Sequence, residues 1–323
     1  MERKMGKATR DAFGEALAEA GSDEKIVVVD GDVGNSTKTE VFGKKYPDRF
    51  FQTGIDESNL VGVAAGLAAN GKTAVAASFA VFLTCNAYDQ MRMSVALPHL
   101  NVKFVGSHAG VSIGEDGPSQ MAVEDLALTT ALGGVTVIVP ADEFATRALT
   151  KEMLNMIGPV FLRTGRPKTP MVYDDQTEFE IGKAVQLRDG NDVTLVANGH
   201  MVARALDAAD QLAERQIQAR VIDMHTVKPI DRDALERAAN ETKGIVVCEE
   251  HLAHGGLGAA CAMAVAESRP APMRFVNLGD KYAESGKGEE LMDEYGLSVE
   301  DIVEAARDLV EHQVTLSDMP SPR

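Results

Sequence analysis

The stretch IVVVDGDVGNSTKT, residues 26–39, joins a short apolar run to a polar loop. Its first five residues, Ile26–Asp30, are β-branched and almost all apolar, as expected of a parallel strand that is buried on both faces. In open α/β sheets, ligands bind beyond the carboxyl ends of the strands. The stretch therefore predicts a parallel-sheet fold and places the polar residues 30–39 where a functional site would form.

The rest of the chain alternates similar apolar runs with segments of helical period. We expect further strands at 73–77, 102–105, 135–139, 160–163, 193–196, 219–222, 244–248 and 273–276, and helices at 9–20, 57–69, 86–96, 142–157, from 202 and from 299. Ser298 and Asp301 form a capping signature before the last helix, and the tail after residue 312 is expected to be loose.

This alternation predicts an α/β fold of two doubly wound domains with mainly parallel sheets. We expect the first domain over residues 1–165 and the second over residues 191–323. Residues 166–190 are rich in proline and acidic side chains and lack helical period, which is typical of a linker.

Charge and composition exclude some classes of function. The chain has 323 residues and a formal net charge of −17, and no apolar run reaches the length of a transmembrane helix. An acidic protein is repelled by nucleic-acid phosphates and anionic lipids, so we expect neither nucleic-acid nor membrane partners. The three cysteines are scattered and match no disulfide or zinc framework. We therefore expect a cytoplasmic protein that binds no metal through its own side chains.

Unusual side chains gather in the loops that follow the predicted strands of the first domain. The candidates are Glu57, Phe79, Phe82, His108, Asp116 and Arg163. Each has an ordinary alternative: a glutamate early in a helix complements the helix dipole, paired phenylalanines pack in a core, and Arg163 with Arg166 would form a solvated face. Their shared position at the strand ends of one domain favours a single site.

The order of these motifs resembles one enzyme family. The run HAGVSIGEDGPSQMAVEDLAL, residues 108–128, resembles the active-site loop of transketolases, in particular the animal-type branch. GIDESNL resembles the segment with the catalytic glutamate, and SFAVF with AYDQMRM resembles the pyrimidine-stacking loop with a one-residue insertion. KATRDAFGEAL, DGDVGNST, FLRTGRP, HTVKPIDRD and EEHLAHGGLGAA also follow the family, so the resemblance spans residues 7–312.

The resemblance implies thiamine diphosphate as cofactor, with only part of its binding site on this chain. The family fingerprint that holds Mg²⁺ and the diphosphate, GDG followed by an Asn pair, is missing: residues 30–32 read DGD and no Asn pair follows. The chain therefore resembles a pyrimidine-binding domain joined to a transketolase C-terminal domain. The resemblance implies a partner, an N-terminal transketolase subunit that binds the diphosphate with Mg²⁺ or Ca²⁺, in an α2β2 heterotetramer.

The resemblance also assigns roles toward the cofactor. Glu57 is expected to donate a hydrogen bond to the pyrimidine ring, which requires a carboxyl group that shares its proton. Phe79 and Phe82 are expected to pack on that ring, since an aromatic face offers no competing donor. Asp32 is expected near the thiamine ring.

For the substrate, the resemblance places Arg10, Ser36, His108 and Arg163 at phosphate-binding positions. Two guanidinium groups suit a phosphate because each can donate two parallel hydrogen bonds. His108 and Asp116 fall on positions that contact sugar hydroxyls or phosphate. Gln120 stands where the microbial and plant branch has a histidine that contacts the donor. These positions imply transfer of a two-carbon ketol unit from a ketose phosphate to an aldose phosphate; a sulfonated sugar stays open.

Other interpretations share part of these features. The β subunit of a 2-oxoacid dehydrogenase and a fragment of a deoxyxylulose phosphate synthase have the same two-domain layout, and a non-catalytic interaction subunit is the alternative outside enzymes. A dinucleotide-binding fold is disfavoured because no G-x-G-x-x-G follows the first strand. In the second domain, the glycines of residues 255–258 would either cradle an anion or allow tight packing at a subunit interface, and we favour the packing role.

Overall fold

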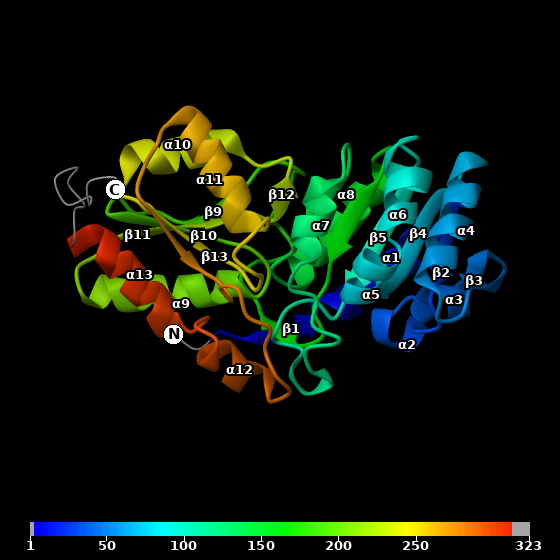
Figure 1. The fold of residues 1–323 in the computed structure, drawn as a ribbon, viewed down its shortest axis with the longest axis horizontal. Helices are drawn as coiled ribbons and strands as arrows, with labels where there is room; N and C mark the ends of the chain where they lie inside the picture. Colours follow the sequence, from blue (N-terminus) through cyan, green and yellow to red (C-terminus); the bar gives the residue numbers. More distant parts are fainter. Residues whose placement is uncertain (1–2, 312–323) are drawn as a thin grey trace, which may run out of the picture.

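The structure, a computed structural model, describes residues 3–311. The predicted tail after residue 312 lies outside the described residues. Two sheets stand side by side, the N-terminal half on the right and the C-terminal half on the left of Figure 1. The expected class, two doubly wound and mainly parallel α/β units, is confirmed.

The first sheet, as described within residues 3–311, has seven strands in the order β12-β6-β7-β5-β4-β2-β3. All neighbours are parallel except β12 and β6. The strands are β2 (Ile26–Asp30), β3 (Phe50–Gln52), β4 (Thr73–Phe79), β5 (Val102–Ser107), β6 (Thr136–Ile138), β7 (Val160–Arg163) and β12 (Thr226–Lys228). This order brings the ends of β2, β4, β5 and β7 to one edge of the sheet.

The second sheet has five strands over the same described range, in the order β14-β13-β10-β11-β9, and only β9 is antiparallel to its neighbour. They are β9 (Val185–Arg188), β10 (Val193–Ala197), β11 (Ala219–Asp223), β13 (Ile245–Cys248) and β14 (Met273–Val276). A separate antiparallel pair joins β1 (Met5–Ala8) to β8 (Lys168–Pro170). The pair ties the start of the chain to the segment that follows β7.

Helices cover both faces of each sheet. In the first half they are α1 (Thr9–Ala20), α2 (Gly34–Thr37), α3 (Glu40–Lys45), α4 (Glu57–Ala69), α5 (Ala80–Asn86), α6 (Tyr88–Gln90), α7 (Asp125–Ala131) and α8 (Glu143–Asn155), with 3₁₀ turns η1 (Pro47–Arg49) and η3 (Gly114–Asp116) and a π-helix η2 (Met91–Ala96). In the second half they are α9 (Met201–Glu214), α10 (Arg232–Glu241), α11 (Leu257–Ser268), α12 (Gly288–Glu294) and α13 (Val299–Glu311).

In the part of the chain that the structure describes, two hydrophobic cores run through both halves. Successive strand residues point to opposite faces, so Val28 enters one core while Val27 and Val29 enter the other. The first core joins α1 and α8 to α9 and α13, and the second joins α4 and α5 to α10 and α11. Because each core crosses from one half to the other, the two sheets are packed as one body.

Strands form within the expected linker and pair across the expected domain boundary. Val185–Arg188, inside the predicted linker, is an edge strand of the second sheet, and Lys168–Pro170 pairs with the start of the chain. Thr226–Lys228, inside the predicted second domain, completes the first sheet beside β6. These strands are short and depend on long-range pairing, so local sequence pattern does not reveal them.

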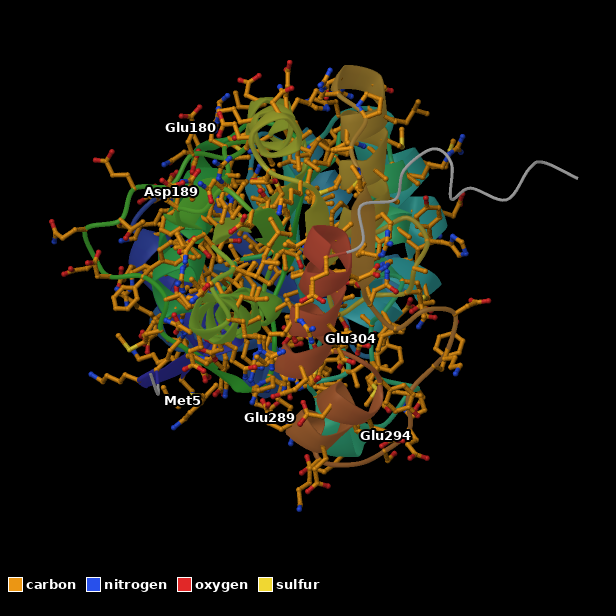
Figure 2. All side chains as sticks on the ribbon, turned by 90° about the vertical axis from the view of Figure 1, so that its left-hand side faces the viewer. Met5, Glu180, Asp189, Glu289, Glu294 and Glu304 are labelled. Carbon is orange, nitrogen blue, oxygen red and sulfur yellow. The ribbon has the colours of Figure 1, made fainter. Side chains whose placement is uncertain are left out.

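Acidic side chains are spread over the surface. Those labelled in Figure 2 are all exposed: Glu180 and Asp189 lie in loops of the C-terminal half, Glu289 and Glu294 on α12, and Glu304 on α13. The net charge of −17 is thus distributed rather than concentrated in one patch on this side. Within residues 3–311, each helix is too short or too polar to cross a bilayer.

A buried carboxyl group lies where the segment after β8 meets the second sheet. The Asp223 side chain, at the end of β11, is fully buried, and the Tyr173 hydroxyl donates a hydrogen bond to its Oδ2 at 2.7 Å. Burial raises the pKa of Asp223 to about 8, although the bond from Tyr173 opposes the rise. The folded chain therefore keeps a proton on this group at neutral pH.

We expect Asp223→Asn to remove a pH dependence of stability. The unfolded chain releases this proton near pH 3.9, about the ordinary aspartate value, whereas the folded chain keeps it up to a pH of about 8. The contribution of Asp223 to the unfolding free energy therefore falls as pH rises between these values, by at most about 1.4 kcal/mol per pH unit. Denaturant titrations of the unchanged chain and of Asp223→Asn at several pH values between the two pKa values would measure this fall. If the unfolding free energies of the two proteins changed in parallel with pH, the raised pKa of Asp223 would be contradicted.

Candidate active site

Asp30, the last residue of β2, organises the loop that follows the first strand. Its carboxylate is fully buried and accepts hydrogen bonds from the hydroxyls of Thr37 and Thr39 at 2.8 and 2.7 Å. Burial raises the pKa of Asp30, and the two hydroxyls counteract part of the rise. These bonds fold the loop against the strand end, which brings Asn35 and Ser36 to the edge of the sheet.

The start of α1 is tied to the loop that follows β7. The Gly165 amide donates to Thr9 Oγ1 at 2.7 Å, and the Arg10 amide donates to the Gly165 carbonyl at 3.4 Å. This connection places the side chains of Arg10 and Arg166 around the same space. Burial lowers the pKa of Arg10; Asp11 opposes the change and the nearby Arg166 charge adds to it.

His108 follows β5 with a left-handed backbone (φ 60°), and its ring stacks on Phe79 with centroids 3.9 Å apart. Arg10 Nη1 lies 3.2 Å from His108 Nε2. Because a guanidinium only donates, Nε2 accepts and Nδ1 donates to Ser107 Oγ at 2.9 Å. Burial, reinforced by the charges of Arg10 and Arg166, lowers the pKa of His108 to about 3. The imidazole is therefore neutral near pH 7 and holds the Arg10 guanidinium in place.

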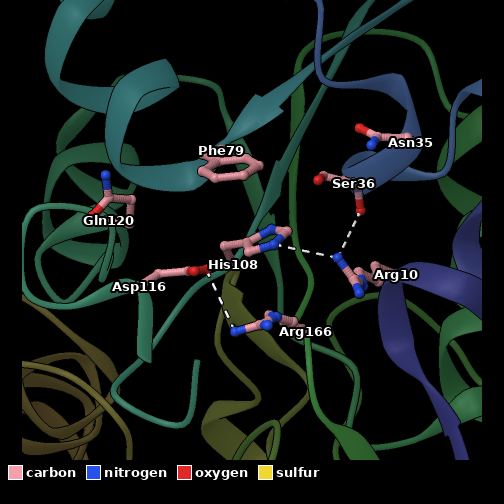
Figure 3. Close-up of a pocket in the computed structure, with 8 residues that line it drawn as sticks. All are labelled: Arg10, Asn35, Ser36, Phe79, His108, Asp116, Gln120 and Arg166. Atoms are coloured by element: carbon pink, nitrogen blue, oxygen red, sulfur yellow. Dashed lines mark hydrogen bonds and ion pairs between the residues drawn. The ribbon is translucent and has the colours of Figure 1, made fainter. Parts of the chain in front are cut away.

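These segments surround one pocket of about 490 Å³. Its eight lining residues are Arg10, Asn35, Ser36, Phe79, His108, Asp116, Gln120 and Arg166. Figure 3 shows the two arginines below the His108 ring, with Phe79 above it and Gln120 on the opposite side from Ser36. Two cations beside amide and hydroxyl groups suit a small anionic molecule that carries hydroxyl groups.

Arg166 faces Asp116 at the lower edge of this pocket. Arg166 Nη1 donates to the Ile113 carbonyl at 2.9 Å and lies 3.5 Å from Asp116 Oδ2 and 3.3 Å from Glu115 Oε2. Ion pairs that remain open to solvent contribute little to stability. An anionic ligand can therefore replace these carboxylates as the partner of Arg166 at small cost.

Six of the residues predicted from the sequence line this pocket: Arg10, Ser36, Phe79, His108, Asp116 and Gln120. Asn35 and Arg166 also line it, although sequence reasoning did not select them. Arg166 belongs to the same FLRTGRP motif as Arg163, three residues beyond the strand end. The position of Arg166 beyond the strand end was the signal in the sequence that could have identified it. A residue beyond the strand lies at the edge of the sheet, where ligands bind, whereas a residue of the strand itself points into the layer of helices beside the sheet.

Glu57 lies outside the lining of the pocket but is connected to it through β4. Its side chain is 5% exposed, and Ser78, next to the pocket residue Phe79, donates a hydrogen bond to Glu57 Oε1 at 2.9 Å. Across residues 3–311, no Lys, Arg or His forms an ion pair with this carboxyl group. A buried carboxyl with only a hydroxyl partner retains hydrogen-bonding capacity for a ligand.

Phe82 and Asp32 also lie outside the pocket lining. Phe82 is half-buried and roughly parallel to Phe79, with ring centroids 6.0 Å apart and an interplanar angle of 13°. Asp32 is exposed in a left-handed conformation (φ 65°), and its amide donates to Gln52 Oε1 at 2.9 Å. Both remain at the same edge of the first sheet, since they follow β4 and β2.

The expectation that Arg163 binds phosphate does not fit its surroundings. Arg163 is 5% exposed, and its Nε and Nη2 donate to the two carboxylate oxygens of Asp125 at 2.8 and 3.1 Å. Nη2 also donates to the carbonyls of Ala122 and Glu250, both at 2.9 Å. Burial opposes the charge, but the carboxylates of Asp125 and Glu250 raise the pKa of Arg163 overall. The Nε and Nη2 donors of Arg163 are thus used within the protein, and Arg166 is the arginine that lines the pocket.

The glycine-rich start of α11 binds an anion from its own chain. The Glu249 carboxylate accepts hydrogen bonds from the amides of Leu257 and Gly258, both at 2.7 Å. Gly256 leaves room for that carboxylate, because an added Cβ would collide with it. An external anion would therefore find these amides occupied, and the packing of the glycines at a subunit interface stays a prediction.

Two family models together match nearly the whole described chain. Residues 5–171 match the pyrimidine binding domain of transketolase, and residues 182–302 match the transketolase C-terminal domain. The chain is 39% identical over 305 residues to the 6-deoxy-6-sulfo-D-fructose transketolase subunit SqwH of Clostridium sp. (strain MSTE9), covering 94% of this chain and 95% of that protein. It is 40% identical over 308 residues to the transketolase of Homo sapiens, covering 94% of this chain and 49% of the human protein. The chain thus spans about half the length of the human enzyme.

A solved structure agrees over the same length. The structure titled split gene transketolase, inactive beta4 tetramer, superimposes with a TM-score of 0.89 at 45% identity, covering 95% of this chain and 99% of that one. Sequence, family models and fold therefore agree in both halves. The chain belongs to the transketolase family and comprises its pyrimidine-binding and C-terminal domains.

Proposed function

We propose that this chain is the C-terminal subunit of a two-chain transketolase. In this proposal it transfers a two-carbon ketol unit from a ketose phosphate to an aldose phosphate together with an N-terminal subunit. The observation that carries the proposal is the pocket in which Arg10 and Arg166 converge beside Phe79 and His108. This pocket lies at the strand ends of the first sheet, one residue along β4 from the Ser78 partner of Glu57.

The residues around Glu57 fit the aminopyrimidine part of thiamine diphosphate. A buried carboxyl without a cationic partner suits a hydrogen bond to a ring nitrogen, and the half-buried, parallel rings of Phe79 and Phe82 suit a flat heterocycle. When bound, thiamine diphosphate supplies the nucleophilic carbon of ketol transfer. Ser78 holds Glu57 at Oε1, so we assign Oε2 to the proton that Glu57 shares with the pyrimidine.

The sugar phosphate would enter the pocket with its anionic end toward the arginines. Arg10 and Arg166 donate to the phosphate oxygens, and the Ser36 hydroxyl adds a neutral donor. His108 orients the Arg10 guanidinium through Nε2. Asp116 and Gln120, which line the pocket from the loop opposite, would contact the sugar hydroxyls and turn the substrate toward the cofactor.

The N-terminal subunit would bind the diphosphate with Mg²⁺ or Ca²⁺, since this chain lacks GDG followed by an Asn pair. We propose an α2β2 assembly, because each site needs domains from two kinds of chain. A sulfonated sugar is the second candidate substrate: the Clostridium relative is named for a 6-deoxy-6-sulfo-D-fructose, and the two arginines would accept a sulfonate as well as a phosphate.

We expect this chain, mixed with an N-terminal chain that carries GDG and the Asn pair, to convert xylulose 5-phosphate and ribose 5-phosphate into a heptulose phosphate and a triose phosphate. The reaction should require thiamine diphosphate and both chains, because the cofactor site is shared. Mass spectrometry of the products would measure it, with 6-deoxy-6-sulfo-D-fructose as a parallel donor. Prompt decarboxylation of pyruvate without ketol transfer would contradict the proposal in favour of a 2-oxoacid dehydrogenase. Light scattering of the active complex would test the α2β2 stoichiometry.

A further inference from the structure

The loop of residues 109–122, which carries Asp116 and Gln120, is held by the C-terminal half of the chain. One residue of the C-terminal half that contacts this loop is Glu250, which lies just beyond the end of β13. Its side chain is 5% exposed, and its Oε1 accepts a hydrogen bond from the Ser112 amide at 2.9 Å. A carboxylate that accepts from a buried amide makes a charge-assisted bond, which is stronger than a neutral one.

Two glycines of the loop lie against the C-terminal half so closely that a side chain would not fit. An added Cβ at Gly110 would collide with the Glu250 carboxylate, and one at Gly114 would lie 2.8 Å from the Gly288 amide nitrogen. Both glycines have positive φ, 86° and 77°. The loop therefore takes a path that only glycine allows at these two positions, with the C-terminal half as its support.

Arg163 fixes the far end of the same loop to the same segment. Its Nη2 donates both to the Ala122 carbonyl, at the end of the loop, and to the Glu250 carbonyl. Glu250 is thus attached through its backbone to one end of the loop and through its side chain to Ser112. Between these two points the loop projects Asp116 and Gln120 into the pocket (Figure 3).

We propose that Glu250 is a positioning residue for the substrate pocket: its carboxylate, as the acceptor for the Ser112 amide, sets the course of the loop that presents Asp116 and Gln120. The C-terminal half then controls substrate binding without lining the pocket. This role rests on the proposed function for its effect on catalysis, but the anchoring itself does not depend on it. The requirement is a hydrogen-bond acceptor that reaches Ser112, which glutamine also provides.

The test compares Glu250→Ala, Glu250→Asp and Glu250→Gln, with Glu236→Ala as the matched control because Glu236 is an exposed glutamate on α10. Hydrogen exchange of residues 110–117 in the full chain reports the anchoring, and kcat and KM of the reconstituted pair report its effect. We expect Ala and Asp to speed exchange of these amides by about tenfold or more. The same two variants should lower kcat/KM for the sugar phosphate by about tenfold, mainly through KM, because binding groups are displaced. Gln should remain closer to the unchanged protein than Ala or Asp, because it keeps the acceptor and loses only the charge assistance of the bond.

The outcomes separate cleanly. Unchanged exchange in both Ala and Asp, or a Gln variant as defective as Ala, would overturn the acceptor role. If the Ala and Asp variants exchanged fast but kept their kcat/KM, the proposed effect of the anchored loop on substrate binding would be wrong. The Ala and Asp variants could also exchange fast while the pair with the unchanged chain shows no ketol transfer. That result would support the anchoring by Glu250 and reject the proposed function. If thermal unfolding shows that the Ala variant is not folded, the comparison of the Asp variant with the Gln variant tests the acceptor role.

Discussion

Turnover by the reconstituted enzyme is expected to fall by about 10²- to 10⁴-fold in Glu57→Ala, because the change removes a proton-transfer group. The chain should stay folded, since the carboxyl takes part in no ion pair within residues 3–311 and its loss leaves only the Ser78 hydroxyl without a partner. Steady-state rates, together with thermal unfolding of each variant, would measure both parts of the prediction.

Glu57→Gln provides the matched control for this effect. A glutamine keeps the shape of the side chain and an oxygen that accepts from Ser78, but it does not transfer a proton. We expect Gln to lose nearly as much turnover as Ala while unfolding at the temperature of the unchanged chain. Substantial activity in the Gln variant would show that the carboxyl proton is not used, and Glu57 would then be a structural residue of α4.

The two arginines of the FLRTGRP motif are expected to have separate effects. Arg166→Ala should lower kcat/KM for phosphorylated sugars by about 10- to 150-fold, the equivalent of a charge-assisted hydrogen bond of about 1.5–3 kcal/mol, with little change in stability. Arg163→Ala should instead destabilise the fold by about 3–5 kcal/mol, because it leaves the fully buried carboxylate of Asp125 without its partner. Kinetics and denaturant unfolding of both variants would distinguish the roles.

The double variant Arg163→Met with Asp125→Leu controls for the buried charge. It removes both ionic partners, so it should be more stable than Arg163→Ala alone. If Arg163→Ala proved as stable as the unchanged chain but failed to bind phosphate, the assignment of the two arginines would have to be reversed. If Arg166→Ala lost stability and kept its kcat/KM, the pocket would not be a phosphate site.

Much of the local structure could be predicted from particular residues. The helices Thr9–Ala20, Glu57–Ala69 and Val299–Glu311 begin where the sequence pattern predicts, and the Ser298 hydroxyl and Asp301 carboxylate form the expected cap. Of the six candidate residues that line one pocket, all except Arg10 lie at or beyond the carboxyl ends of parallel strands, whereas Arg10 comes from the start of α1. Such features depend on periodicity and on the direction of the strands, which neighbouring residues encode.

The sequence by itself determined the α/β class, the strand ends that carry the site and the resemblance to transketolases. Tertiary structure alone decided that Arg166 rather than Arg163 reaches the pocket, that Thr226–Lys228 completes the first sheet, and that Glu250 holds the loop of Asp116. The physical reason is the range of the interactions. Periodicity is set by neighbouring residues, whereas a buried ion pair, an added edge strand and a glutamate on a distant amide depend on segments that meet only after folding.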